Sequence, residues 1–114
     1  FGRFWHDRKR YMGTDERGED AVAHLHFPGL SPEAAAWLVE ERKIAAVGID
    51  TPSIDHGQSK LFEAHQRLFK ANTPAFENVA NLESLPARGA TVIALPMKIE
   101  AGSGNPLRII AILP

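Results

Sequence analysis

Residues 31–50, with the sequence SPEAAAWLVEERKIAAVGID, point to the class of fold. Ser31 can cap the free amide groups of a helix start, Pro32 has the backbone angle of a first helical turn, and Glu33 complements the positive helix end. Apolar side chains follow before a charged end. We therefore expect a helix over residues 31–42.

An almost entirely apolar run, residues 44–49, follows this helix. Such a run is typical of a strand that is covered on both faces, so it predicts a buried sheet and an α/β fold. Working outward, we expect a loop or broken helix over residues 1–20, strands over 21–27 and 76–80, a helix over 59–71, a helical turn over 81–86, and a hairpin with strands over 91–99 and 107–113.

Length and composition limit the class of protein. A chain of 114 residues can form one domain with one core. Its 13 basic and 14 acidic residues are interspersed, so we expect neither a nucleic-acid nor a membrane partner. The lack of cysteine excludes thiolate nucleophiles and iron–sulfur clusters. No secretion signal opens the chain, and we expect a cytoplasmic protein.

A polar loop with proline and glycine, residues 50–57, follows the predicted buried strand. Loops at the carboxyl ends of such strands are common ligand sites in α/β proteins. Asp50, Asp55 and His56 are therefore candidates for ligand contact. The alternative is that these aspartates only cap turns, as aspartates often do.

His65 and Glu77 are unusual for their predicted surroundings. His65 lies on the apolar face of the second predicted helix, where an imidazole needs either a hydrogen-bond partner in the core or a metal ion. Glu77 lies beside Phe76 in a predicted strand. Its carboxylate is either buried, where it would need a partner to offset the cost of burial, or on an exposed face of the strand. A turn through Pro74 would bring the two together. Imidazole plus carboxylate is ligand chemistry for zinc or manganese.

Four segments follow one another in a specific order along the chain. They are HLHFPGLSPE at residues 24–33, VGIDTPSID at 47–55, His65 with ENVANL at 77–82, and ALPMKI at 94–99 with GSGNPLR at 102–108. With these segments the chain resembles the cyclase family of metal-dependent hydrolases. That family includes bacterial kynurenine formamidases and isatin hydrolases.

The resemblance implies a mixed β-sheet with flanking helices, the swivelling β/β/α-like fold of the family. It also implies hydrolysis of a small amide or lactam C–N bond by a metal-activated water, as in arylformamidases, with zinc or manganese as the cofactor. His65 and Glu77 match two of the family's metal ligands in residue type and spacing. Asp50 and Ser53 match positions near the family's pocket and are candidates for substrate binding, whereas the catalytic residue stays unknown.

The chain also departs from the family pattern. The family's principal metal motif, His-x-Gly-Thr-His-x-Asp-x-Pro, does not occur in it. Residues 1–114 therefore look like a single domain that forms the carboxyl-terminal portion of such a hydrolase, inactive alone. The expected partners are a small-molecule substrate and either an amino-terminal half or a second copy of the chain. The alternative function is a non-catalytic binding or assembly module that retains the cyclase fold.

Overall fold

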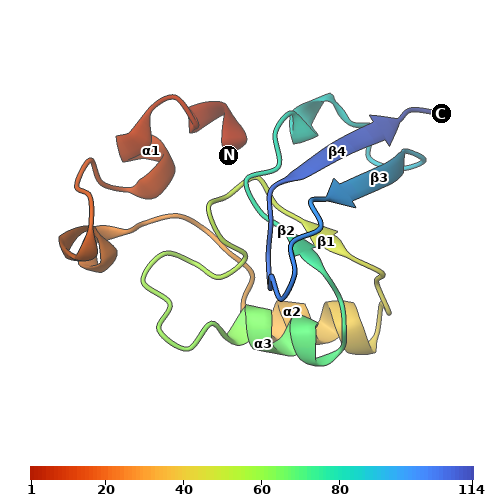
Figure 1. Cartoon of the computed structure of the whole chain (residues 1–114), viewed down its shortest axis with the longest axis horizontal. Coiled ribbons are helices and arrows are strands. Elements are labelled where there is room, and N and C mark those ends of the chain that lie inside the picture. The colour runs from red at the N-terminus through yellow and green to blue at the C-terminus, as the bar shows by residue number, and fades with distance from the viewer. The chain divides into compact units, whose positions relative to one another are not determined.

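The computed structural model describes all 114 residues, which form two units, residues 1–82 and 83–114. In chain order the elements are η1 (Gly2–Phe4), α1 (Arg8–Met12), η2 (Glu19–His24), α2 (Pro32–Glu40), β1 (Val47–Gly48), α3 (Glu63–Lys70), β2 (Ala75–Phe76), η3 (Leu82–Ser84), β3 (Thr91–Pro96) and β4 (Leu107–Ile112), where η denotes a 3-10 helix (Figure 1). One strand pair is parallel and the other antiparallel, so the predicted mixed α/β class is confirmed. That the chain acts as a single domain stays a prediction. Every helix of the structure is too short or too polar to span a lipid bilayer.

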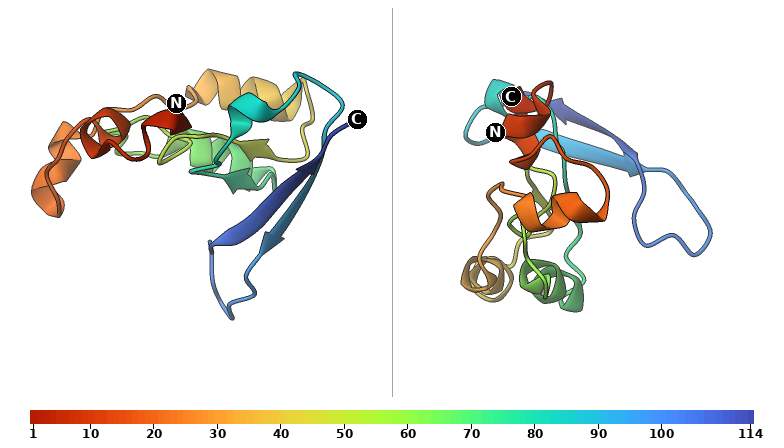
Figure 2. Two further views of the ribbon diagram at one scale, coloured as in Figure 1. Left: turned by 90° about the horizontal axis from the view of Figure 1, so that it is seen from above. Right: turned by 90° about the vertical axis from the view of Figure 1, so that its left-hand side faces the viewer.

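Helix α2 begins where the sequence predicts. The Ser31 hydroxyl accepts a hydrogen bond from the amide of Ala34 at 3.1 Å, and Pro32 occupies the first turn. The helix lies beside α3, and Figure 2 shows the pair nearly end-on in its right-hand view. Ala35 of α2 and Ala64 of α3 are both fully buried. Small side chains at such a contact allow two helices to approach closely.

Helix α3 begins at Glu63, four residues later than the sequence predicts, because Phe62 before it has a left-handed backbone angle φ of +50°. Its buried side chains are Ala64 and Leu68. The predicted apolar face is therefore only partly correct, since Phe62 and Phe69 are about half exposed.

Strands β1 and β2 pair in parallel, with Val47 opposite Ala75 and Gly48 opposite Phe76. The predicted strand over residues 44–49 is thus shorter than expected. It is also not covered on both faces, because Ala45, Ala46 and Gly48 are exposed. Within these 114 residues the apolar run is therefore only partly buried, through Ile44, Val47 and Ile49.

The core of the first unit consists of Ala35, Ile54, Ala64 and Leu68, all fully buried. Partly buried apolar side chains surround it, namely Leu30, Val39, Ile44, Val47, Ile49 and Ala75. The core therefore joins α2, α3, β1 and β2 to the loop that contains Ile54.

Replacement of Leu68 by alanine should destabilise the first unit by about 2–5 kcal/mol, because it leaves a cavity among side chains that are excluded from water. Urea unfolding followed by circular dichroism measures this loss. Leu61→Ala is the matched control, since Leu61 is largely exposed and its replacement should change the free energy of unfolding by about 0.5 kcal/mol or less. Equal losses in the two variants would contradict this description of the core.

The predicted strand over residues 21–27 is wrong. Residues Glu19–His24 form the 3-10 helix η2, and the chain then continues in an extended conformation without a strand partner. Its backbone instead bonds the end of α1 and a loop: the amide of His26 donates to the carbonyl of Met12, and the carbonyl of Phe27 accepts from the amide of Gly57. Alternation of apolar residues does not distinguish such a segment from a strand, because a strand also needs a neighbouring strand.

The second unit contains the antiparallel hairpin of β3 and β4, which the sequence predicts correctly. Consecutive apolar residues occur in both strands, with Val92 and Ile93 in β3 and Ile109 and Ile110 in β4. Successive side chains of a strand point to opposite faces, so both faces of the hairpin are apolar. Val92 and Ile110 are about half exposed within this chain.

Candidate metal centre

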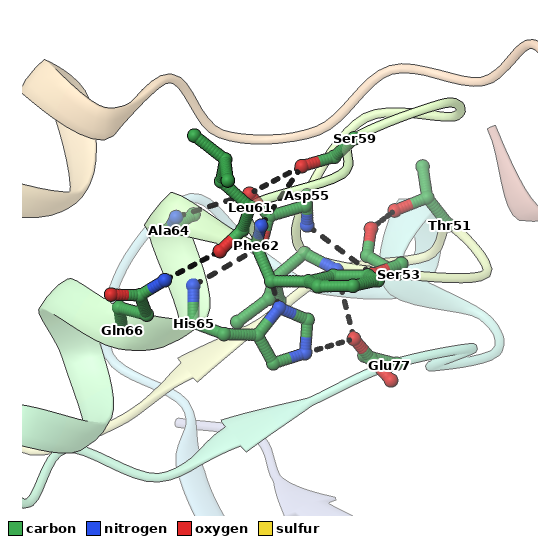
Figure 3. Close-up of polar contacts among 11 residues, drawn as sticks. Thr51, Ser53, Asp55, Ser59, Leu61, Phe62, Ala64, His65, Gln66 and Glu77 are labelled. Atoms are coloured by element: carbon green, nitrogen blue, oxygen red, sulfur yellow. Dashed lines mark hydrogen bonds and ion pairs between the residues drawn. The ribbon is translucent and has the colours of Figure 1, made fainter.

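Three short segments of the first unit converge at the candidate site (Figure 3). The loop after β1 contains Asp55, the first turn of α3 contains His65, and Glu77 directly follows β2. Backbone hydrogen bonds fix the segment of Glu77 on both sides: the carbonyl of Phe76 accepts from the amide of Ile49, and the amide of Asn78 donates to the carbonyl of Thr51, each at 2.9 Å.

The imidazole of His65 lies between two carboxylates. Its Nδ1 is 2.5 Å from Oδ2 of Asp55, and its Nε2 is 3.2 Å from Oε1 of Glu77. The same Oε1 accepts a hydrogen bond from the amide of Ile54 at 2.9 Å. The exposed fractions of the side chains are 25% for His65, 32% for Glu77 and 4% for Asp55. The structure thus brings His65 and Glu77 together at a partly open position, and it adds Asp55 behind them.

Asp55 is one of the loop residues predicted to contact a ligand, and its sequence position does not link it to the metal site. Its carboxylate also accepts hydrogen bonds from the amides of Ala64 at 3.0 Å and His65 at 3.1 Å, and from the Ser59 hydroxyl at 3.4 Å. Burial would raise the pKa of Asp55, but the hydrogen bonds from the His65 ring and from the two amides outweigh burial and lower this pKa. Asp55 is therefore an ionised acceptor at neutral pH.

The lowered pKa of Asp55 predicts a loss of stability in acid. The folded chain stabilises the ionised form of this carboxyl, so its pKa is lower in the folded than in the unfolded chain. Its contribution to the free energy of unfolding is therefore complete above the unfolded pKa of about 3.9 and disappears as the pH falls through the lower folded pKa. The free energy of unfolding in urea should therefore fall as the pH drops below about 4. The Asp55→Asn chain should show a smaller fall over the same range; an equal fall would assign the effect to other carboxyls.

The other two predicted site residues have contacts of a different kind. Oδ2 of Asp50 accepts a hydrogen bond from the amide of Gly2 at 2.7 Å. The Ser53 hydroxyl accepts from the amide of Asp55 at 3.3 Å, and its carbonyl accepts from the Thr51 hydroxyl at 2.7 Å. Asp50 thus holds the first residues of the chain, and Ser53 shapes the loop that presents Asp55. Their roles in substrate binding stay predictions.

The donor atoms of His65 and Glu77 fit part of a divalent-metal site. An imidazole nitrogen and a carboxylate oxygen that face each other are suitable ligands for zinc or manganese. Metal-binding histidines usually donate their other ring N–H to a carboxylate or carbonyl, which is the place of Asp55 here. No three His, Cys, Asp or Glu side chains of the 114 residues are grouped to hold a metal ion. The chain therefore offers two ligands, fewer than the three protein ligands usual at catalytic zinc.

Known proteins resemble the chain in sequence and in structure. Residues 2–56 match the family model Cyclase, described as "Putative cyclase". The isatin hydrolase of Roseibium aggregatum is 37% identical over 112 residues, which are 95% of this chain and 40% of that protein. The structure of isatin hydrolase A from Ralstonia solanacearum superimposes with a TM-score of 0.84 and 34% identity, covering 99% of this chain and 42% of that one. The chain belongs to the cyclase family.

Other members of the cyclase family agree with this assignment. The kynurenine formamidase of Polaromonas naphthalenivorans is 33% identical over 84 residues, which are 74% of this chain and 37% of that protein. The chain thus spans about two fifths of the length of the cyclase-family relatives it matches. Its fold corresponds to part of the isatin hydrolase fold, as the resemblance in sequence predicts.

Proposed function

We propose that this chain is part of a metal-dependent hydrolase that cleaves C–N bonds of small amides or lactams. The strongest support is the position of His65, whose Nε2 lies 3.2 Å from Oε1 of Glu77. Nδ1 of the same ring forms a hydrogen bond with Asp55. The relatives are named isatin hydrolase and kynurenine formamidase, which agrees with a reaction on lactams and formamides.

In this proposal His65 and Glu77 hold one side of a zinc or manganese ion, and residues outside these 114 complete the site. When bound, such an ion polarises a substrate carbonyl and lowers the pKa of a bound water to about 7. The chain itself contributes the two ligand atoms and the loop and helix that fix them. None of these 114 residues is a cysteine, so a thiolate nucleophile could come only from outside them.

Paramagnetic line broadening by Mn²⁺ tests the proposed ligands directly. In NMR spectra of the ¹⁵N-labelled chain, substoichiometric Mn²⁺ should selectively broaden the signals around His65 and Glu77, and Glu77→Gln should greatly reduce the effect. The surface pair of His24 and Glu16 is an internal comparison, since its Nδ1 and Oε2 lie 2.6 Å apart in an exposed position. Broadening at that pair but not at His65 would contradict the proposal.

Asp50 and Ser53 are proposed as residues near the substrate. In a complete enzyme Asp50→Asn should lower turnover with little loss of stability, because the side chain keeps its shape and loses only its charge. Thermal unfolding and steady-state kinetics on the same preparation measure both quantities. A large loss of stability with unchanged metal binding would instead make Asp50 a structural residue, in line with its hydrogen bond to the amide of Gly2.

A further inference from the structure

Asp55 has two roles that meet in the first turn of α3. The residue that precedes this helix, Phe62, provides no side-chain hydrogen bond to the free amides of the first turn. Asp55, which lies nine and ten positions earlier in the chain, accepts from the amides of Ala64 and His65 instead. The same Oδ2 atom that accepts from the His65 amide also contacts the His65 ring. One carboxylate thus fixes both the backbone and the imidazole of His65.

The two carboxylates compete for the ring proton of neutral His65. A carboxylate can only accept a hydrogen bond, so the ring nitrogen that keeps the proton is the one with the stronger acceptor. Nδ1 is 2.5 Å from Asp55, whereas Nε2 is 3.2 Å from Glu77. Asp55 is also nearly buried, where a charged acceptor interacts more strongly than at the one-third exposed Glu77. In addition, Glu77 Oε1 already accepts from the amide of Ile54.

We propose that Asp55 is a positioning residue that holds neutral His65 in the Nδ1–H form and so directs the unprotonated Nε2 toward Glu77. The purpose of this positioning depends on the proposed metal site. The position of the ring proton, however, can be measured in the chain without metal. With the lone pair of Nε2 already directed at the position between His65 and Glu77, a divalent cation finds a ligand that needs neither rotation nor loss of a proton.

Long-range ¹H–¹⁵N NMR spectra of the metal-free chain test the inference, because their cross-peak patterns distinguish the two neutral forms of a histidine ring. The signals of His65 are assigned by their loss in His65→Gln, at a pH where the ring is neutral. We expect the Nδ1–H form in the unaltered chain. In Asp55→Ala the Nε2–H form should prevail, because Glu77 is then the remaining carboxylate acceptor.

The matched control is Ser59→Ala. The Ser59 hydroxyl donates to Oδ1 of Asp55 and accepts from the amide of Phe62. Removing this hydroxyl therefore weakens the start of α3 but leaves the contacts of the imidazole in place. Ser59→Ala should keep the Nδ1–H form and the Mn²⁺ affinity of the unaltered chain. Asp55→Ala should lower that affinity by about 10- to 100-fold, as changes of such outer partners usually do.

The possible results separate this inference from the proposed function. An Nε2–H ring in the unaltered chain overturns the role of Asp55, whether or not Mn²⁺ binds at His65. This result needs only the unaltered chain, so it stands even if Asp55→Ala does not fold. An unchanged ring form in folded Asp55→Ala overturns it as well. An Nδ1–H ring that shifts in Asp55→Ala, in a chain that does not bind Mn²⁺ at His65, supports the positioning role and contradicts the metal site.

Discussion

A mixture of this chain with an amino-terminal segment that carries the His-x-Gly-Thr-His-x-Asp-x-Pro motif should hydrolyse a small amide that neither part hydrolyses alone. The reason is the number of ligands. The chain offers His65 and Glu77, no third His, Cys, Asp or Glu is grouped with them to hold a metal ion, and a catalytic zinc usually has three protein ligands. Metal affinity should rise together with activity, by about 100-fold or more, because ligands held in one site act together.

Light scattering, metal titration and an amidase assay, before and after mixing, measure the three parts of this prediction. Before mixing, the chain should bind a divalent ion weakly, show no amidase activity and associate with itself. After mixing, it should associate with the added segment. A monomeric chain with full activity by itself would contradict the requirement for further ligands. A complex that assembles without hydrolysing any amide would favour the non-catalytic binding or assembly module.

In the assembled complex, His65→Ala should nearly abolish both metal occupancy and turnover. Loss of a direct ligand should exceed the about 10- to 100-fold effect of changing an outer partner, so we expect a fall of at least about 100-fold in both quantities. Elemental analysis of the purified complex and steady-state kinetics measure them. His65→Ala also removes the ring partner of the nearly buried Asp55 carboxylate, so the metal-free chain should lose some stability as well, and the metal content is the deciding measurement.

His56→Ala is the matched control for this prediction. His56 lies in the same loop as Asp55, next to it in sequence, and its residue is exposed. Its replacement should leave metal occupancy unchanged. If His65→Ala mainly lowers stability and the metal content stays the same, His65 is a histidine of the core with hydrogen-bond partners, and the metal site must lie elsewhere.

The sequence predicts best those elements whose signals are local. Ser31 and Pro32 start α2 through their own backbone and side-chain geometry, and β-branched runs around a glycine-rich turn give the hairpin of β3 and β4. The strand predicted at residues 21–27 is wrong. Its alternation of apolar and polar residues is a local signal, whereas a strand also requires a distant partner segment, which the local sequence does not specify. The start of α3 at Glu63 is missed for a similar reason, because its cap, Asp55, comes from outside the helix.

The residues of the candidate site are identified in two ways: two of them from the family resemblance, and one from the structure alone. His65 and Glu77 are identified because their types and spacing match a family motif, and the structure places them together. Asp55 is only one of several loop aspartates in the sequence. Its importance follows from hydrogen bonds to Ala64 and His65, which no spacing rule predicts.

The two apolar faces of the β3–β4 hairpin have a consequence for the life of the chain in a cell. Uncovered strands with half-exposed side chains such as Val92 and Ile110 are templates for pairing with other copies, which leads to aggregation. Pro96 at the end of β3 and Pro106 just before β4 lack the amide hydrogen that such pairing needs, and Arg108 adds a charge within β4. These three residues should therefore slow the pairing of the hairpin with other copies of the chain.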